Sequence, residues 1–266
     1  MLEGVVPFPP EFARRYREKG YWQDKSLAEE FKAVFENYAD RTAIIDGKIC
    51  LTYRQLDELS TNLALNLLDL GFEPLDRVVP QLPTIKEFPI LYFALQKIGC
   101  IPIASLSTHR YAEISQFVEL SGAVACVTPD RHRDFSFTDM VTRIRGESTT
   151  LKYGIVLGEA PNGFVSLTEL IERPATRKQT ELDALQIDPT DPAVFQLSGG
   201  TTGIPKLIPR THNDYAYNSR TATEVTEVDG DSCLLLVLPI AHNLPLACPG
   251  MQGFMLRGGR IVLSTS

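Results

Sequence analysis

Short apolar segments alternate with longer amphipathic segments between residues 77 and 158. The apolar segments are continuous rather than alternating with polar residues. They are RVVPQL (77–82), CIPIASL (100–106), AVACVTP (123–129) and YGIVLG (153–158). Continuous apolar runs are typical of strands covered on both faces, and we expect helices in the intervening segments 86–99 and 110–122. The alternation predicts an α/β fold with open, mostly parallel sheets flanked by helices.

The N-terminal region carries local signals for two helices and a hairpin. A short helix is also expected in an extended arm over 7–24. Ser26 precedes apolar residues at helical spacing and is a good N-cap. Thr52 opens a capping box for a helix that runs to about residue 70. Between these helices we expect a β-hairpin that turns at Asp46-Gly47.

Two segments, 129–150 and 172–192, are polar and poor in periodicity. The second is interpreted as a linker between structural units. We therefore predict an N-terminal α/β subdomain with its arm over 1–190, and the start of a second, incomplete unit over 191–266. The end of the chain, LRGGRIVLSTS, is expected to form the last arm of a hairpin.

Composition excludes several classes of protein. The formal net charge of −7 argues against a general nucleic-acid or membrane-surface role. The apolar runs are shorter than the roughly 20 residues that cross a bilayer. Five cysteines without a C-x-x-C pair predict buried free thiols in a protein of the reducing cytoplasm. We assign no metal ligands within the chain.

The segment LSGGTTGIPKLIPRTHNDY at 197–215 is the strongest functional signal. Backbone N–H groups of small residues converge on anions in such loops, and hydroxyls and a lysine add donors and charge. Ile204 stands where the common mononucleotide loop needs glycine. A flexible surface turn is the alternative, but the density of donors favours a di- or triphosphate. The predicted phosphate-binding residues are Ser198, Gly199, Gly200, Thr201, Thr202, Gly203 and Lys206.

This segment resembles the phosphate loop of the adenylate-forming superfamily, whose pattern is [S/T]-[S/G]-G-[S/T]-T-G-x-P-K. The continuation KLIPRTHNDYAYN is similar to that of the aryl-acid–AMP ligases of siderophore biosynthesis, which activate 2,3-dihydroxybenzoate or salicylate. PFPPEFARRYREKGYW, LTYRQLDELS and LPIAHNLPLACPG agree with this resemblance. It implies the first half of the large N-terminal domain of such an enzyme.

The resemblance implies a two-step reaction that uses ATP and Mg²⁺. An aryl carboxylate first gives an acyl-adenylate and pyrophosphate. The acyl group then passes to the phosphopantetheine thiol of an aryl carrier protein. The loop would hold the β- and γ-phosphates with Lys206 close by, and Lys206 and His242 are the expected catalytic residues.

The segment LPIAHNLPLACPG at 238–250 is the candidate aryl pocket. A few polar groups in an apolar loop suit a small aromatic ligand, although a lone histidine is more often structural. The resemblance implies that Asn243 bonds the 2-hydroxyl and that His242 lies beside the carboxylate. Serine at position 248 bonds the 3-hydroxyl in dihydroxybenzoate ligases. Cys248 therefore favours salicylate, with 2,3-dihydroxybenzoate as runner-up, and Leu244 replaces the usual aromatic residue.

The resemblance also implies elements beyond Ser266. They are an adenine-binding stretch with a magnesium-binding glutamate, a ribose-binding aspartate, and a C-terminal domain with a catalytic lysine. We therefore expect the chain alone to be weak or inactive as a ligase. Two alternatives remain at this point: a non-catalytic module that binds nucleotide and aryl acid, and a general acyl-CoA ligase.

Overall fold

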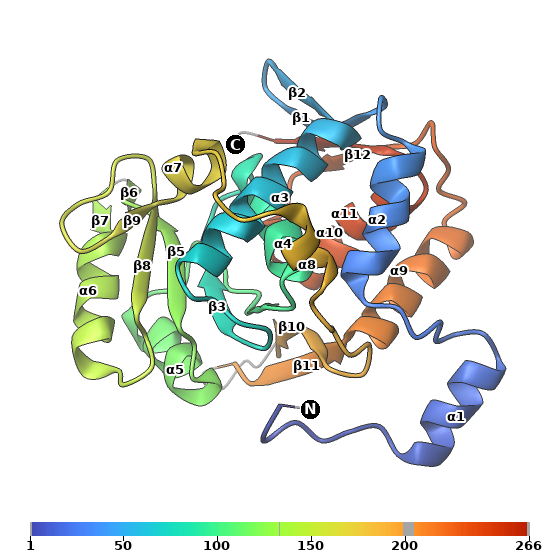
Figure 1. Cartoon of the computed structure of the whole chain (residues 1–266), viewed down its shortest axis with the longest axis horizontal. Helices are drawn as coiled ribbons and strands as arrows, with labels where there is room; N and C mark the ends of the chain where they lie inside the picture. Colours follow the sequence, from blue (N-terminus) through green and yellow to red (C-terminus); the bar gives the residue numbers. More distant parts are fainter. Residues whose placement is uncertain (1, 133, 199–204, 265–266) are drawn as a thin grey trace.

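The computed structural model describes residues 2–132, 134–198 and 205–264 of the chain. Within these ranges the strands form one five-stranded sheet, one four-stranded sheet and two two-stranded pairs. Figure 1 shows the five-stranded sheet towards the left and the four-stranded sheet towards the upper right, with helices around both.

The five-stranded sheet has the order β4-β3-β5-β8-β9, and each neighbouring pair is parallel. Its strands are β3 (Arg77–Pro80), β4 (Ile101–Pro102), β5 (Ala125–Pro129), β8 (Tyr153–Leu157) and β9 (Val165–Ser166). The first four lie in the four continuous apolar segments. The predicted α/β fold with mostly parallel sheets is confirmed.

The four-stranded sheet has the order β12-β13-β1-β2. Its strands are β1 (Thr42–Asp46), β2 (Ile49–Thr52), β12 (Cys233–Leu236) and β13 (Arg260–Leu263). The expected β1–β2 hairpin is present. The prediction that 256–266 forms a hairpin arm is wrong, because β13 runs parallel to both β12 and β1. Two helices separate β12 from β13, and such a crossover is what a parallel pair requires.

This sheet combines strands from the first 52 residues with strands from the last 34 residues of the chain. Strands of both expected units therefore share one sheet. The division at residue 190 stays a prediction.

Five helices lie in the described part of the first half of the chain. They are α1 (Pro10–Glu18), α2 (Leu27–Asn37), α3 (Tyr53–Asp69), α4 (Glu87–Lys97) and α5 (Tyr111–Ser121). Two of them, α2 and α3, begin at the predicted capping residues. The side chains of Ser26 and Thr52 accept hydrogen bonds from the third residue of α2 and α3, and that residue's side chain bonds back. These local signals are therefore confirmed.

The segment 129–150 was predicted to be poor in periodicity, and that prediction is wrong for its second half, which forms a helix. It holds the short pair β6 (Arg131–His132) and β7 (Phe135–Ser136), followed by α6 (Phe137–Glu147). The apolar residues that α6 buries lie at i, i+3, i+4 and i+7, and are Phe137, Met140, Val141 and Ile144. The next polar region holds the end of α7 (Leu167–Glu172) and the short α8 (Gln179–Asp183).

The prediction of buried cysteines holds only in part. Cys100 and Cys126 are buried, whereas Cys50 and Cys233 are exposed on the four-stranded sheet. All five thiols are free. Among the described residues, none of the helices combines the length and the apolar character that spanning a bilayer requires.

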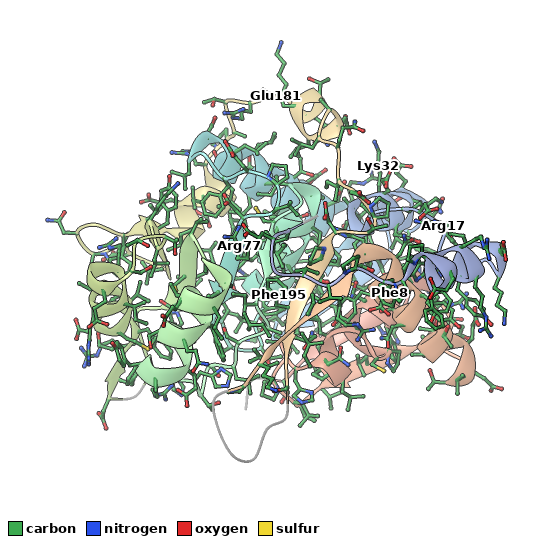
Figure 2. The ribbon with its side chains drawn as sticks, turned by 90° about the horizontal axis from the view of Figure 1, so that it is seen from below. Phe8, Arg17, Lys32, Arg77, Glu181 and Phe195 are labelled. Atoms are coloured by element: carbon green, nitrogen blue, oxygen red, sulfur yellow. The ribbon has the colours of Figure 1, made fainter. Side chains whose placement is uncertain are left out.

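The elements that carry the predicted site follow the five-stranded sheet in sequence. They are β10 (Pro192–Leu197), β11 (Leu207–Thr211), α9 (His212–Val225), α10 (Asn243–Ala247) and α11 (Gly250–Leu256). Phe195 of β10 joins the core of the five-stranded sheet, where its carbonyl accepts from the Ala104 amide at 2.9 Å. Figure 2 shows Phe195 and Arg77 near the centre of the molecule and Lys32 and Glu181 near its edge.

Candidate functional site

The glycine-rich segment connects β10 and β11, which pair as antiparallel strands. Leu197 of β10 is in register with Leu207 of β11. Beyond them, the Ser198 amide donates to the Lys206 carbonyl at 3.0 Å, and the Lys206 amide donates to Ser198 Oγ at 2.9 Å. Ser198 and Lys206 are thereby held together. The other predicted phosphate-binding residues, which are Gly199, Gly200, Thr201, Thr202 and Gly203, lie outside the described residues.

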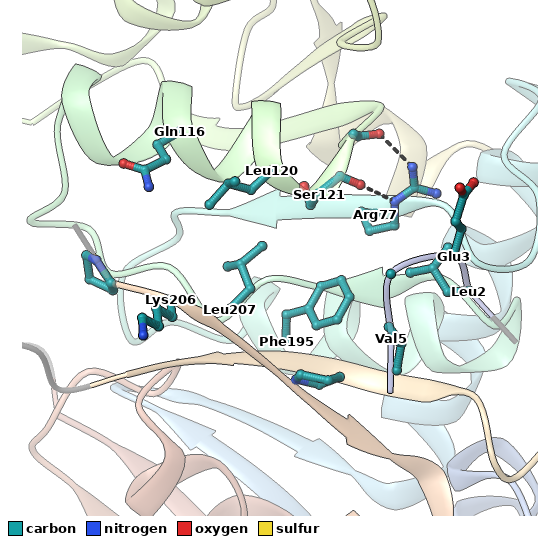
Figure 3. A pocket seen from close by; sticks show the side chains of 14 residues that line it. Leu2, Glu3, Val5, Arg77, Gln116, Leu120, Ser121, Phe195, Lys206 and Leu207 are labelled. Carbon is teal, nitrogen blue, oxygen red and sulfur yellow. Dashed lines mark hydrogen bonds between the residues drawn. The ribbon is translucent and has the colours of Figure 1, made fainter. Parts of the chain in front are cut away.

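A cavity of about 600 Å³ lies at the foot of this segment. Figure 3 shows it between α5 and the β10–β11 pair, with Lys206, Leu207 and Phe195 on one side and Leu120 on the other. Arg77 also lines it, but its guanidinium donates to the carbonyls of Ser121 and Gly122 at the end of α5. Lys206 is exposed and borders both the cavity and the glycine-rich segment.

The predicted aryl pocket follows β12 and is built around the short helix α10. His242 caps this helix: its Nδ1 accepts from the Leu244 amide at 3.4 Å, and its side chain is otherwise exposed. Asn243 is half-buried at the first position, and Cys248 is half-buried at the C-cap. The three predicted aryl-pocket residues are therefore brought together on one helical turn and its caps.

Tyr215 of α9 links this turn to β10. Its hydroxyl donates to Asn243 Oδ1 at 3.1 Å and accepts from Gln196 Nε2 at 2.9 Å. The side chain is fully buried, and burial raises the pKa of its phenol well above the ordinary value. The hydroxyl therefore stays protonated at neutral pH.

Arg210 of β11 lies over the ring of Tyr215, with 5.2 Å between the guanidinium carbon and the ring centroid. Burial acts to lower the pKa of Arg210, but the hydrogen-bonded Asp214 carboxylate raises it above its ordinary value. The charge is therefore kept beside the aromatic ring.

The backbone of the aryl loop is fixed by α9. The Ala247 carbonyl accepts from Asn218 Nδ2 at 2.8 Å and from Ser219 Oγ at 2.9 Å. Gly250 then starts α11 with φ +50°, and a Cβ there would lie 2.5 Å from the carbonyl carbon of Pro245. Only glycine permits this combination of dihedral and close approach.

Gln196 and Tyr215 were not singled out from the sequence. Tyr215 lies within the RTHNDYAYN stretch that carries the family resemblance, but nothing in that stretch indicates its contact with Asn243, 28 residues away. Gln196 is two residues before Ser198, so a single buried hydroxyl connects the strand that leads into the phosphate loop with the aryl loop.

The described part of the chain contains no group of three or more His, Cys, Asp or Glu residues that could hold a metal ion. The groups around α10 are an amide, a thiol and an imidazole. Mg²⁺ prefers oxygen ligands and is commonly carried by the substrate's phosphates with one or two carboxylates. These residues therefore fit an organic ligand better than a resident magnesium ion.

Comparison with known proteins identifies the family. The sequence pattern of the AMP-binding enzyme family matches residues 31–266. This chain belongs to the AMP-binding enzymes. The adenylate-forming resemblance predicted from the glycine-rich segment is thus confirmed.

Relatives of this AMP-binding enzyme include two aryl-acid ligases. The chain is 40% identical over 266 residues to 2,3-dihydroxybenzoate-AMP ligase of Bacillus subtilis, covering 100% of this chain and 48% of the relative. It is 38% identical over 268 residues to the salicyl-AMP ligase / salicyl-S-ArCP synthetase of Mycobacterium tuberculosis, covering 99% of this chain and 46% of the relative. The chain spans about half the length of the curated relatives it matches.

Among solved structures, the apo structure of MbtA from Mycobacterium smegmatis matches with a TM-score of 0.90 at 38% identity, covering 99% of this chain and 48% of that chain. The anthranilate CoA ligase AuaEII, in complex with anthranoyl-AMP, matches with a TM-score of 0.80 at 20% identity. The second match shows a shared fold. The predicted architecture is therefore that of the adenylate-forming enzymes.

Proposed function

We propose that this chain supplies the phosphate-binding and acid-binding parts of an aryl-acid–AMP ligase. The enzyme converts a 2-hydroxylated aryl acid and ATP into an acyl-adenylate and pyrophosphate. It then passes the acyl group to the phosphopantetheine thiol of an aryl carrier protein, in siderophore biosynthesis. The observation that carries the proposal is that relatives named for these acids align with essentially the whole chain.

The first step is an in-line displacement at the α-phosphorus of ATP. A carboxylate oxygen of the acid forms the new P–O bond, and pyrophosphate leaves with the electrons of the broken one. This step depends on positioning and charge neutralisation more than on a covalent protein nucleophile. The loop between Ser198 and Lys206 would hold the leaving phosphates, with the Lys206 ammonium beside them. Mg²⁺ bound to the phosphates would neutralise further charge.

The acid would bind around α10. Asn243 bonds the 2-hydroxyl, and His242 lies beside the carboxylate. Cys248 would lie near the 3-position, where a thiol is a weak hydrogen-bond partner. Burying a 3-hydroxyl without a good partner costs about 1–3 kcal/mol. Salicylate is therefore the proposed substrate, ahead of 2,3-dihydroxybenzoate.

ATP–pyrophosphate exchange tests this proposal. The chain would be assayed alone and after in-frame fusion to the C-terminal half of the Bacillus subtilis relative, with salicylate, 2,3-dihydroxybenzoate or benzoate. We expect exchange in the fusion, fastest with salicylate, and little in the chain alone. A fusion that binds salicylate without exchange would instead indicate a non-catalytic module. Acyl transfer to coenzyme A but not to a carrier protein would indicate an acyl-CoA ligase.

A further inference from the structure

The buried hydroxyl of Tyr215 has one hydrogen, and the structure shows where it goes. Gln196 Nε2 donates to the phenol oxygen, so that the phenol hydrogen is directed to Asn243 Oδ1. Tyr215 is fully buried and Gln196 is buried, so the bond between them is shielded from water, whereas the Asn243 end of the second bond is half-buried. Hydrogen-bond donation therefore runs in one direction, from Gln196 to Tyr215 and from Tyr215 to Asn243.

This direction fixes which edge of the Asn243 amide is free. A side-chain amide is planar, with its acceptor oxygen and its two N–H donors on opposite edges. Because Oδ1 is held by Tyr215, the Nδ2 hydrogens project away from it. Within the described ranges, Nδ2 has no hydrogen-bond acceptor. A ligand beside Asn243 therefore meets a donor rather than an acceptor.

We infer that Tyr215 is a positioning residue that locks Asn243 as a hydrogen-bond donor, so that the site selects aryl acids with an acceptor oxygen ortho to the carboxylate. The inference rests on the proposed function and adds a selection rule to it. In salicylate the 2-hydroxyl donates its hydrogen to the neighbouring carboxylate, which leaves the hydroxyl oxygen as an acceptor. The 2-amino group of anthranilate offers hydrogens and a weakly basic, conjugated nitrogen. Benzoate offers nothing at this position.

Equilibrium binding of these three acids to the 266-residue chain tests the rule. The parent is expected to bind salicylate about tenfold more tightly than benzoate or anthranilate, as one well-formed hydrogen bond allows. In Tyr215→Phe the amide is released, so that most of the salicylate preference should be lost and the affinity for benzoate retained. Unchanged benzoate affinity distinguishes loss of positioning from collapse of the pocket.

Tyr92→Phe is the matched control. Tyr92 is also a buried tyrosine, and its hydroxyl has no hydrogen-bond partner in the described part of the chain. Removing this hydroxyl should leave the order of the affinities for the three acids unchanged. A Tyr215→Phe variant that keeps the salicylate preference overturns the inference alone. A parent that prefers anthranilate overturns it as well, because the amide would then present its oxygen.

A measurement on the parent covers the case in which Tyr215→Phe does not fold. In ¹⁵N-labelled protein, the Asn243 side-chain N–H resonances should shift clearly more on saturation with salicylate, which accepts a hydrogen bond from them, than on saturation with benzoate, which does not. Salicylate binding without such a shift contradicts the inference while leaving the proposed function intact. A parent that binds none of the acids contradicts both.

Discussion

Ser198 and Lys206 hold each other across the base of the glycine-rich segment through two hydrogen bonds, one in each direction. The Ser198 hydroxyl therefore accepts from the protein backbone before any ligand arrives. Ser198 and Lys206 therefore have a defined geometry before a ligand binds, and preorganised groups lose less conformational entropy on binding.

Replacing Ser198 by Ala removes the acceptor of the Lys206 amide. We expect the affinity for Mg·ATP to fall about fivefold to tenfold, the value of one hydrogen bond, because one of the two bonds that hold Ser198 and Lys206 together is lost. Salicylate affinity should not change. Calorimetric titration measures both, with Ser115→Ala as control, since that hydroxyl donates to the Ala112 carbonyl within α5. Equal ATP affinity in Ser198→Ala and parent would count against this role.

Cys248→Ser is predicted to shift the acid preference. Serine supplies a full donor and acceptor for a 3-hydroxyl, so the ratio of 2,3-dihydroxybenzoate to salicylate affinity should rise about tenfold, within the cost of a missing hydrogen bond. Cys50→Ser, at an exposed thiol of β2, should leave the ratio unchanged. If the parent binds both acids equally well, Cys248 does not discriminate between them.

Gly250→Ala should disrupt the aryl loop. Its φ of +50° and the 2.5 Å approach of a Cβ to the Pro245 backbone mean that the loop must move. We expect a loss of unfolding free energy of about 2 kcal/mol or more, together with weaker salicylate binding. Gly146→Ala is the control: a Cβ there has no atom within 4 Å, and it lies in α6. The free energy of unfolding of Gly146→Ala should rise by about 0.5–1 kcal/mol. Denaturant melts compare the two, and a neutral Gly250→Ala would refute the steric argument.

His212 makes stability depend on pH. Burial lowers its pKa from 6.5 to about 4, and its Nδ1 accepts from the Leu27 amide at 3.1 Å. Between these two pH values the unfolded state therefore binds more protons than the folded state. The contribution of neutral His212 to the free energy of unfolding is complete above pH 6.5 and is lost as pH drops towards 4. The loss at pH 5 should be about 2 kcal/mol.

Denaturant melts at pH 7 and pH 5 test this dependence, with His212→Asn as the comparison. The variant keeps a hydrogen-bond acceptor but does not titrate. Its free energy of unfolding should therefore fall by about 2 kcal/mol less than that of the parent between pH 7 and pH 5. Equal pH dependence in parent and variant would show that His212 does not carry the effect.

Local features of this chain were predictable because their signals lie within a few residues of each other. The capping residues Ser26 and Thr52 act on amides three positions away. The hairpin turn at Gly47 and the continuous apolar strands are equally local. The family signal of the glycine-rich segment is also contiguous, and so the class of enzyme followed from the sequence.

Features that depend on distant partners were missed. The orientation of β13 is set by β1, more than 200 residues earlier, and a sequence pattern carries no sign of that pairing. The bond between Tyr215 and Asn243 depends on how α9 packs against α10, which no spacing reports. Helix α6 was missed for another reason: polar residues outnumber the four apolar positions that it buries.

If the proposed function is right, the turn around Asn243 binds an aryl acid while the segment from Ser198 to Lys206 binds the phosphates of ATP. Both sites can be followed by NMR when the ¹⁵N-labelled chain is titrated with salicylate and then with Mg·ATP. Salicylate should shift the resonances of residues 242–248 and Tyr215, and Mg·ATP should shift those of 198–206. Binding of either ligand with its shifts confined to other residues would rule out this assignment of the two sites.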